Sequence, residues 1–94
     1  MKASTRSDIL NRSWEIHAQI ESSYLDDRTK KGDTGWKEKQ RILLADMAIH
    51  LLQTALNPEE IDCEKLTNNI HAILTITDQF LPDAELKTTL EKLY

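Results

Sequence analysis

The sequence predicts an all-α protein, a small antiparallel helical bundle of about four helices: a long helical hairpin, a third helix and a short C-terminal helix. Apolar residues recur at spacings of three and four over most of the chain. The only two glycines and two prolines fall between these periodic segments. Because 94 residues support one small core, we expect residues 1–94 to form a single helical domain.

The first predicted helix runs from about Ser7 to Lys31. Either Ser4 or Ser7 is expected to cap its first turn, because a serine hydroxyl accepts a hydrogen bond from an unpaired amide there. The apolar arc, which includes a histidine, covers about half of the helix circumference. Its members are Ile9, Leu10, Trp14, Ile16, His17, Ile20 and Tyr24.

The segment Lys30–Gln40, KKGDTGWKEKQ, follows this helix and contains both glycines. A phosphate-binding Walker loop needs Lys and then Ser or Thr after its second glycine, but Trp36 follows Gly35. A dinucleotide fingerprint needs a third glycine and a preceding strand. The Gly-x-x-Gly clamp of single-strand-binding KH modules belongs to a fold with a sheet. The segment is therefore interpreted as the turn of a helical hairpin.

Each residue of that turn has a predicted structural role. Gly32 is expected to adopt the left-handed conformation that ends a helix, and Asp33 or Thr34 to cap the next helix. Basic side chains are expected in the last turn of the first helix, where they oppose the negative end of its dipole. These are Arg28, Lys30 and Lys31.

The second predicted helix, about Gly35 to Leu56, is apolar on two sides. One side carries Trp36, Gln40, Leu43, Met47, Leu51 and Thr54. A second line at spacing seven lies nearly opposite and consists of Ile42, Ile49 and Leu56. A helix with two apolar sides needs two partners. The helix is therefore either central in the bundle or uses the second line as the seam of an oligomer.

Two more helices follow. Asn57 and Pro58 indicate a helix start, with Asp62 as a competing cap. The apolar face of the third helix consists of Leu66, Ile70, Ile73, Leu74, Thr77 and Leu81. The run ILTIT within it alternates like a strand, but a single strand would lack a partner. Pro82 then interrupts the chain, and Ala84–Tyr94 is predicted as the last helix.

Charge is unevenly distributed in this chain of net charge -4. Half of its positive side chains lie around the glycine turn: Arg28, Lys30, Lys31, Lys37, Lys39 and Arg41. Trp36 lies among them, where its ring can stack with a basic side chain. This basic cluster is either a solvated end of the hairpin or a docking surface for an acidic protein or a nucleic-acid backbone.

The three histidines raise the question of a metal site. An antiparallel hairpin places His17 level with His50, but helical directions predict that the two do not converge and that His71 points outward. No metal site and no cofactor is therefore predicted. We expect His17 to bond Ser13 or a residue of the second helix, or to form a protonation-sensitive layer. An Asp46–His50 pair is also possible.

No catalytic constellation is apparent. Cys63, the only cysteine, excludes an internal disulfide and is flanked by acidic residues that oppose thiolate formation. No serine or cysteine has a recognisable base and orienting partner, so an enzyme is not expected. The absence of a signal-like or membrane-length apolar run predicts a cytoplasmic protein without a membrane partner.

These observations favour a non-catalytic interaction or regulatory protein that binds a larger protein, in the manner of inhibitors, immunity proteins, antitoxins or chaperones. A homodimer is one of the states open to it. Trp14 lies at the edge of its apolar arc and is a candidate partner-binding residue together with the basic cluster and Trp36. The alternative is a nucleic-acid-binding regulator that uses the basic tip of the hairpin.

Overall fold

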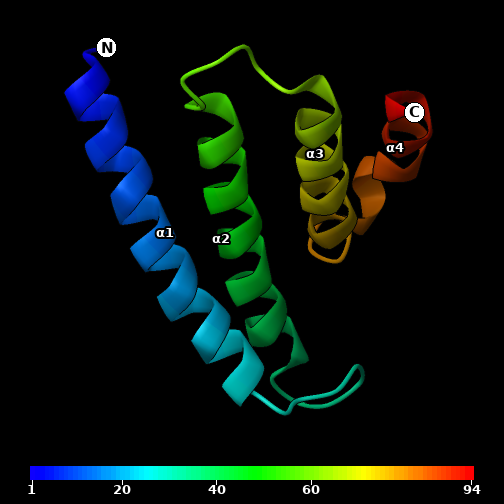
Figure 1. The fold of residues 1–94 in the computed structure, drawn as a ribbon. Coiled ribbons are helices and arrows are strands. Elements are labelled where there is room, and N and C mark those ends of the chain that lie inside the picture. The colour runs from blue at the N-terminus through cyan, green and yellow to red at the C-terminus, as the bar shows by residue number, and fades with distance from the viewer.

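The computed structural model describes all 94 residues and contains four α-helices and no strand, so the all-α prediction is confirmed. The helices are α1 (Ala3–Asp26), α2 (Trp36–Ala55), α3 (Cys63–Thr77) and α4 (Leu86–Leu93), with one turn of 3-10 helix, η1 (Pro82–Ala84), before the last. Each α-helix packs chiefly against its neighbours in sequence. They stand in a row, with α2 and α3 in the middle (Figure 1).

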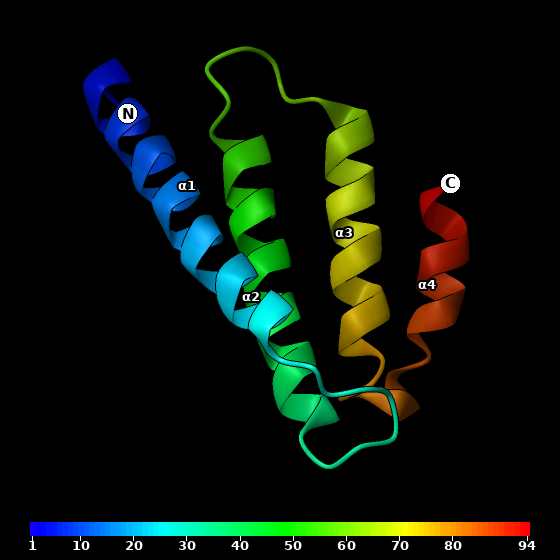
Figure 2. The same ribbon diagram turned by 60° about the horizontal axis from the view of Figure 1, so that its bottom comes forward.

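The row is a single layer of helices. Its extents are 44 × 34 × 16 Å, so the shortest dimension is less than half of either of the others. The radius of gyration is 15.1 Å, against about 12.4 Å for a compact domain of this length. Figure 2 shows the same side-by-side order from a second direction. Both broad sides of the layer therefore face solvent.

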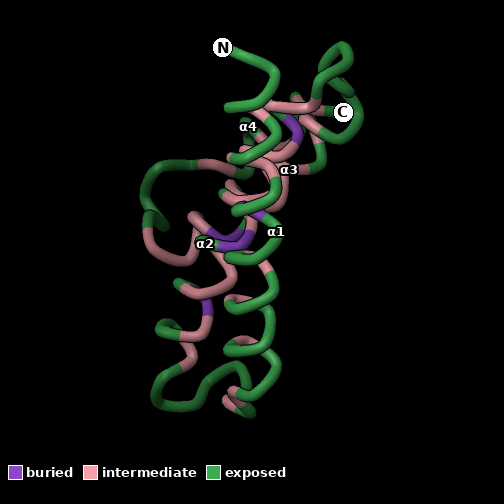
Figure 3. Tube along the Cα trace, turned by 60° about the vertical axis from the view of Figure 1, so that its left-hand side comes forward, coloured by how far each residue is buried: buried purple, intermediate pink, exposed green.

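This flat arrangement leaves little room for an apolar core. Ile76 is the only apolar side chain that is nearly fully buried, at 6% exposed, and most apolar residues of the helices are half-buried (Figure 3). The remaining buried residues are polar: Ser13, Gln40, Asp46 and Thr54. Residues in the middle of the layer are thus more often polar than the amphipathic pattern suggests.

Hydrogen bonds between side chains join neighbouring helices at these buried positions. Between α2 and α3, the Thr54 hydroxyl lies 2.5 Å from Asn69 Oδ1. Just after α3, Gln79 Nε2 donates to Gln40 Oε1 of α2 at 2.9 Å. Between α1 and α2, Gln53 Nε2 donates to the Ser13 hydroxyl at 3.2 Å. No buried side-chain polar atom lacks a partner, which avoids the penalty of an unpaired buried group.

Both ends of the α1–α2 hairpin are joined by a cationic side chain. At one end, Arg6 Nη1 donates to the carbonyl oxygens of Leu56 and Asn57 at 2.9 and 3.3 Å. At the other, Lys39 Nζ donates to the carbonyl oxygen of Asp27 at 2.6 Å and lies 4.7 Å from the centre of the Tyr24 ring. Each cation satisfies carbonyl groups that the end of the opposite helix leaves unpaired.

The predicted ends of the first helix are wrong. The helix starts at Ala3 without a side-chain cap, so Ser4 and Ser7 lie inside it. It stops at Asp26, because Asp27 Oδ1 accepts the Thr29 amide at 2.8 Å and starts a turn there. The basic residues Arg28, Lys30 and Lys31 therefore follow the helix, and its last turn contains none of them.

The loop between α1 and α2 is a turn, as predicted. Gly32 and Gly35 have φ of 95° and 92°, a left-handed conformation that favours glycine. The capping prediction is wrong, because Asp33 Oδ2 accepts the Lys30 amide at 2.9 Å and stabilises the turn itself. Gly35 occupies the N-cap of α2 and provides no side-chain cap, so Thr34 does not fill that role either.

Asp62, predicted as the alternative cap of the third helix, is the residue that caps α3. Asp62 Oδ1 accepts the Lys65 amide at 3.0 Å, whereas Asn57 accepts the Glu59 amide at 3.3 Å and stabilises a turn without a helix. The ILTIT run is helical, and the helix ends at Thr77, short of the predicted Leu81. The last helix begins at Leu86, later than predicted, because η1 and the left-handed Glu85 precede it.

We predict that Ile76→Ala lowers the free energy of unfolding by about 3 kcal/mol, because it leaves a cavity at the one nearly fully buried apolar position. Urea unfolding followed by circular dichroism measures the change. Ile61→Ala is the matched control, since Ile61 is exposed, and should cost less than about 0.5 kcal/mol. Equal losses in the two variants would show that Ile76 does not hold the layer together.

Candidate functional site

A cluster of two histidines and two carboxylates joins the middle of α1 to the middle of α2. His17 Nδ1 lies 2.6 Å from Asp46 Oδ1, and His17 Nε2 lies 2.9 Å from Glu21 Oε2. On α2, His50 Nε2 lies 3.5 Å from Asp46 Oδ2. The two imidazole rings are 4.6 Å apart, centre to centre. We call these four residues the His-carboxylate cluster.

The surroundings of His17, whose side chain is 16% exposed, favour the protonated imidazole. Its hydrogen bond to Asp46, followed by the negative charges of Asp46 and Glu21, raises the pKa of His17 above 6.5, although desolvation opposes this change. Both ring nitrogens face carboxylate oxygens, so a protonated imidazole donates to one on each side.

The structure corrects the predicted directions of the histidines. His17 and His50 are level, as expected from the hairpin, but they converge because Asp46 lies between them. The Asp46–His50 pair is confirmed, and the partner of His17 comes from the second helix. Ser13 donates to the Leu10 carbonyl oxygen at 2.6 Å instead.

His71 remains apart from the cluster, with its ring 5.3 Å from that of Tyr94. The sequence signal that would have revealed the cluster is a His and a carboxylate four residues apart on each helix: His17 with Glu21, and Asp46 with His50. Such a pair shares one helical face. The two faces meet in the hairpin.

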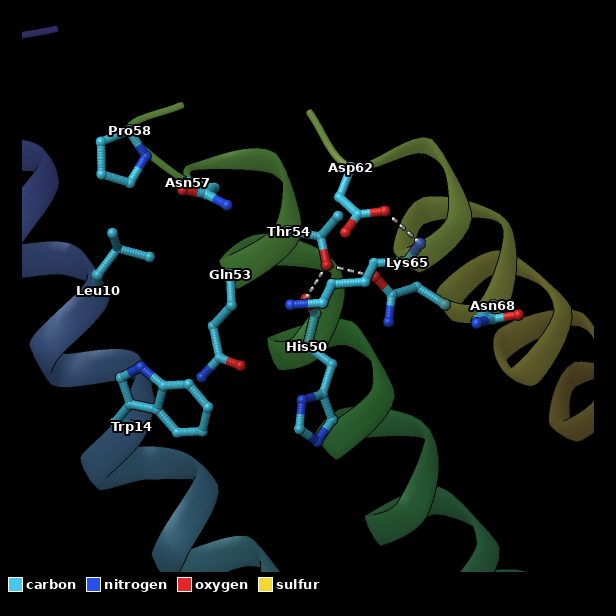
Figure 4. Close-up of a pocket in the computed structure, with 11 residues that line it drawn as sticks. Leu10, Trp14, His50, Gln53, Thr54, Asn57, Pro58, Asp62, Lys65 and Asn68 are labelled. Atoms are coloured by element: carbon cyan, nitrogen blue, oxygen red, sulfur yellow. Dashed lines mark hydrogen bonds between the residues drawn. The ribbon is translucent and has the colours of Figure 1, made fainter. Parts of the chain in front are cut away.

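An open pocket of about 380 Å³ lies beside the cluster and is formed by α1, α2 and the start of α3 (Figure 4). Trp14 and His50 form part of one side, and Asp62, Lys65 and Asn68 form part of the other. Most of the lining side chains are polar. We call the side of the layer on which this pocket opens the front face.

The opposite side of the layer, the back face, has a different composition. At about 100° per helical residue, a position two residues from a front-face residue points about 160° away from it. This rule assigns to the back face Ile16 from Trp14 on α1, Ala48 and Leu52 from His50 on α2, and Ile70 from Asn68 on α3. A shallow hollow of about 330 Å³ between α1 and α2 includes Ile20 and Ile42.

Residues 42–57, which include most of α2, contain one charged residue, and residues 66–77 of α3 contain none. The back face is therefore almost free of charge along these residues, whereas the first turns of α2 place Lys37 and Arg41 on the same side as Ala48, because positions seven and eleven residues apart share a helical face. The predicted seam runs along the edge of this face nearest α1, with Ile42 in the hollow. Ile42, Ile49 and Leu56 are all half-buried. Because α2 lies between α1 and α3, it is central in the layer. The use of Ile42, Ile49 and Leu56 as the seam of an oligomer stays a prediction.

The predicted partner-binding residues differ in their availability. Trp14 is 56% exposed and its ring packs edge-on against His17. In the basic cluster, Lys39 is engaged by carbonyl oxygens of the chain and Arg41 Nη1 donates to Glu38 at 2.9 Å. The other basic side chains, Arg28, Lys30, Lys31 and Lys37, are exposed around the loop, and Trp36 is half-buried.

Cys63 is the first residue of α3, is exposed, and is absent from the His-carboxylate cluster and the pocket. No helix of the protein combines the length and apolar character required to cross a membrane. Comparison with known proteins finds no matching family model, no matching curated protein and no matching solved structure. The arguments for function therefore come from the geometry of this chain.

We predict that stability in a metal-free buffer decreases as the pH rises above 6.5. Because its folded-state pKa is raised, protonated His17 stabilises the fold fully below pH 6.5, and this contribution disappears as the pH rises through the raised pKa. Thermal unfolding at a series of pH values measures the effect. His17→Gln should remove this part of the slope, whereas His71→Gln should retain it; equal slopes in wild type and His17→Gln would refute the assignment.

Proposed function

We propose that this protein is a non-catalytic interaction protein that works as a homodimer, in which the back faces of two copies pack together and the front face remains available to a larger protein. One observation carries the proposal. The chain exposes 6938 Å², whereas a compact monomer of 10.9 kDa exposes about 5,600 Å². The excess is a surface that a partner can cover.

The size of the excess supports a stable subunit interface. It amounts to roughly 1,300 Å² per chain, within the range of about 1,000–2,500 Å² that each subunit contributes to an obligate homodimer. Packing the layer against a second layer would also convert half-buried apolar residues of α2 and α3 into core residues. The two-layer arrangement is the usual way in which helices bury an apolar side.

A second copy is the occupant that the charge distribution favours. A two-fold interface brings each residue near the same patch of the partner, so a charged patch would meet like charge. The back face limits this repulsion because it carries almost no charge along residues 42–57 and 66–77, with Lys37 and Arg41 confined to the first turns of α2. Small side chains at Ala48 and Ala55, both exposed in the single chain, permit close approach of the two layers.

We predict that the protein is dimeric at micromolar concentration and that Ala48→Glu weakens the dimer by at least about 100-fold, because each copy then buries an unpaired carboxylate in the interface. Light scattering coupled to size-exclusion chromatography measures the mass. Because Ala48 is exposed, the variant should retain the helical signal of the wild type.

Ala18→Glu is the matched control for this experiment. It makes the same change at an exposed position of α1 that does not lie on the back face, so the dimer should persist. A wild-type monomer at high concentration, or an Ala48→Glu variant as dimeric as Ala18→Glu, would contradict the proposed interface.

The front face supports the second half of the proposal. Trp14 leaves more than half of its surface exposed at the edge of the pocket, and large aromatic side chains beside pockets are frequent hot spots of protein interfaces. Asn68 and Lys65 line the other side; Asn68 Oδ1 accepts the Tyr94 hydroxyl at 2.5 Å, so the Asn68 amide nitrogen and the Lys65 ammonium remain for hydrogen bonds to a partner. A protein surface that inserts a side chain into this pocket would contact both groups.

We predict that the tagged protein retains a protein partner in extracts of its own cells, that nuclease treatment does not release it, and that Trp14→Ala weakens its binding by about 30-fold or more. Titration with the purified partner measures the change. Leu25→Ala is the control, because Leu25 is another exposed apolar residue of α1 outside the pocket. Equal loss in both variants, or a partner released by nuclease, would contradict a protein-binding front face.

A further inference from the structure

We propose that His17, Asp46 and His50 form a binding site for a divalent metal ion of the Zn²⁺ class. The three side chains offer one ligand atom each, and these atoms all lie within 4.8 Å of one another. They come from two helices that are already held side by side by their own hydrogen bonds. The site is therefore largely formed before a metal ion arrives.

The distances within the cluster suit a shared ion. Ligand atoms bound at about 2.1 Å to a tetrahedral ion lie roughly 3.4 Å apart. His50 Nε2 and Asp46 Oδ2 already have this spacing, at 3.5 Å. His17 Nδ1 lies 2.6 Å from the other Asp46 oxygen, Oδ1, so the carboxylate must turn, or bind through both oxygens, as one ion replaces the proton and contacts all three residues.

Glu21 provides the outer contact that a ligating histidine needs. A histidine bound to a metal through one ring nitrogen usually donates the other N–H to a carboxylate, which fixes its tautomer and orientation. His17 has this arrangement, with Nδ1 directed at Asp46 and Nε2 at Glu21 Oε2, 2.9 Å away.

The ligand types select the class of ion. Two imidazole nitrogens and one carboxylate oxygen suit Zn²⁺ and the neighbouring divalent ions, whereas Ca²⁺ and Mg²⁺ prefer sites built from oxygen alone. Asp46 is buried and His17 is largely so, which limits competition from water. The fourth position is left for water or a partner's side chain, and His50 borders the front-face pocket on that side.

Metal titration of the purified chain tests the site. The protein is stripped with a chelator, freed of any tag, and carries Cys63→Ser so that the exposed thiol cannot bind metal. Isothermal titration with Zn²⁺ at neutral pH is expected to show one ion per chain, and Co²⁺ to give the visible absorption of a four-coordinate site. Mg²⁺ should not compete.

Two variants test the histidine ligands, and a third tests the outer contact. His17→Gln and His50→Gln should each abolish the one-to-one binding, and Glu21→Gln should weaken it by about 10-fold or more because it removes the outer contact. His71→Gln is the control and should bind as the parent does, since His71 lies apart beside Tyr94. Circular dichroism of each metal-free variant checks that the helices remain folded.

The outcomes separate the proposal from a purely structural role of the cluster. No one-to-one Zn²⁺ binding in the folded parent, binding that survives in the His17→Gln and His50→Gln variants, or equal loss in His71→Gln would each overturn it. Because the titration does not depend on dimer formation or on a protein partner, its result is independent of the proposed function.

Discussion

Paired polar side chains between neighbouring helices are the constraint on which this structure depends. A layer one helix thick cannot bury many apolar residues, so the helices are held by contacts such as Thr54 with Asn69 and Gln40 with Gln79. Hydrogen bonds are directional, whereas apolar contacts are not. These pairs therefore fix the register of one helix against the next more strictly than a row of leucines would. Such a layer is stable only if every buried polar side-chain atom has a hydrogen-bond partner, and each of them has one.

The same contacts explain why α2 can be central without a thick core. One side of it bonds α1 through Asp46 and Gln53, and the other bonds α3 through Thr54. Its remaining surface is left for other molecules. The front side holds histidine and the polar pocket, while the back side is apolar and almost uncharged beyond Arg41. One helix thus separates two surfaces of different chemistry, and this separation would let the proposed self-association and partner binding occur together.

Periodicity predicted the fold class, the four helices and the hairpin, because 3.6-residue spacing and the positions of glycine and proline are local properties. Helix ends were less predictable. Asp33 and Asn57 accept amides within turns, although the same residue types cap helices elsewhere, as Asp62 does. Whether such a residue caps a helix or stabilises a turn depends on where the neighbouring helix leaves space for the chain. His17 and His50 converge because of the way α1 and α2 pack against each other. A helical wheel describes one helix at a time and carries no information about this packing.

Because each helix packs chiefly against its immediate neighbours in sequence, most native contacts are local, although those of the α1–α2 hairpin reach from Arg6 to Asn57. Chains of this kind have low contact order and reach the folded state quickly, since little loop entropy is lost before the first contacts form. The arrangement of contacts along the chain also determines where local unfolding begins. α4 meets only α3, so local unfolding that begins at the C-terminus can release one helix while the α1–α2 hairpin stays intact.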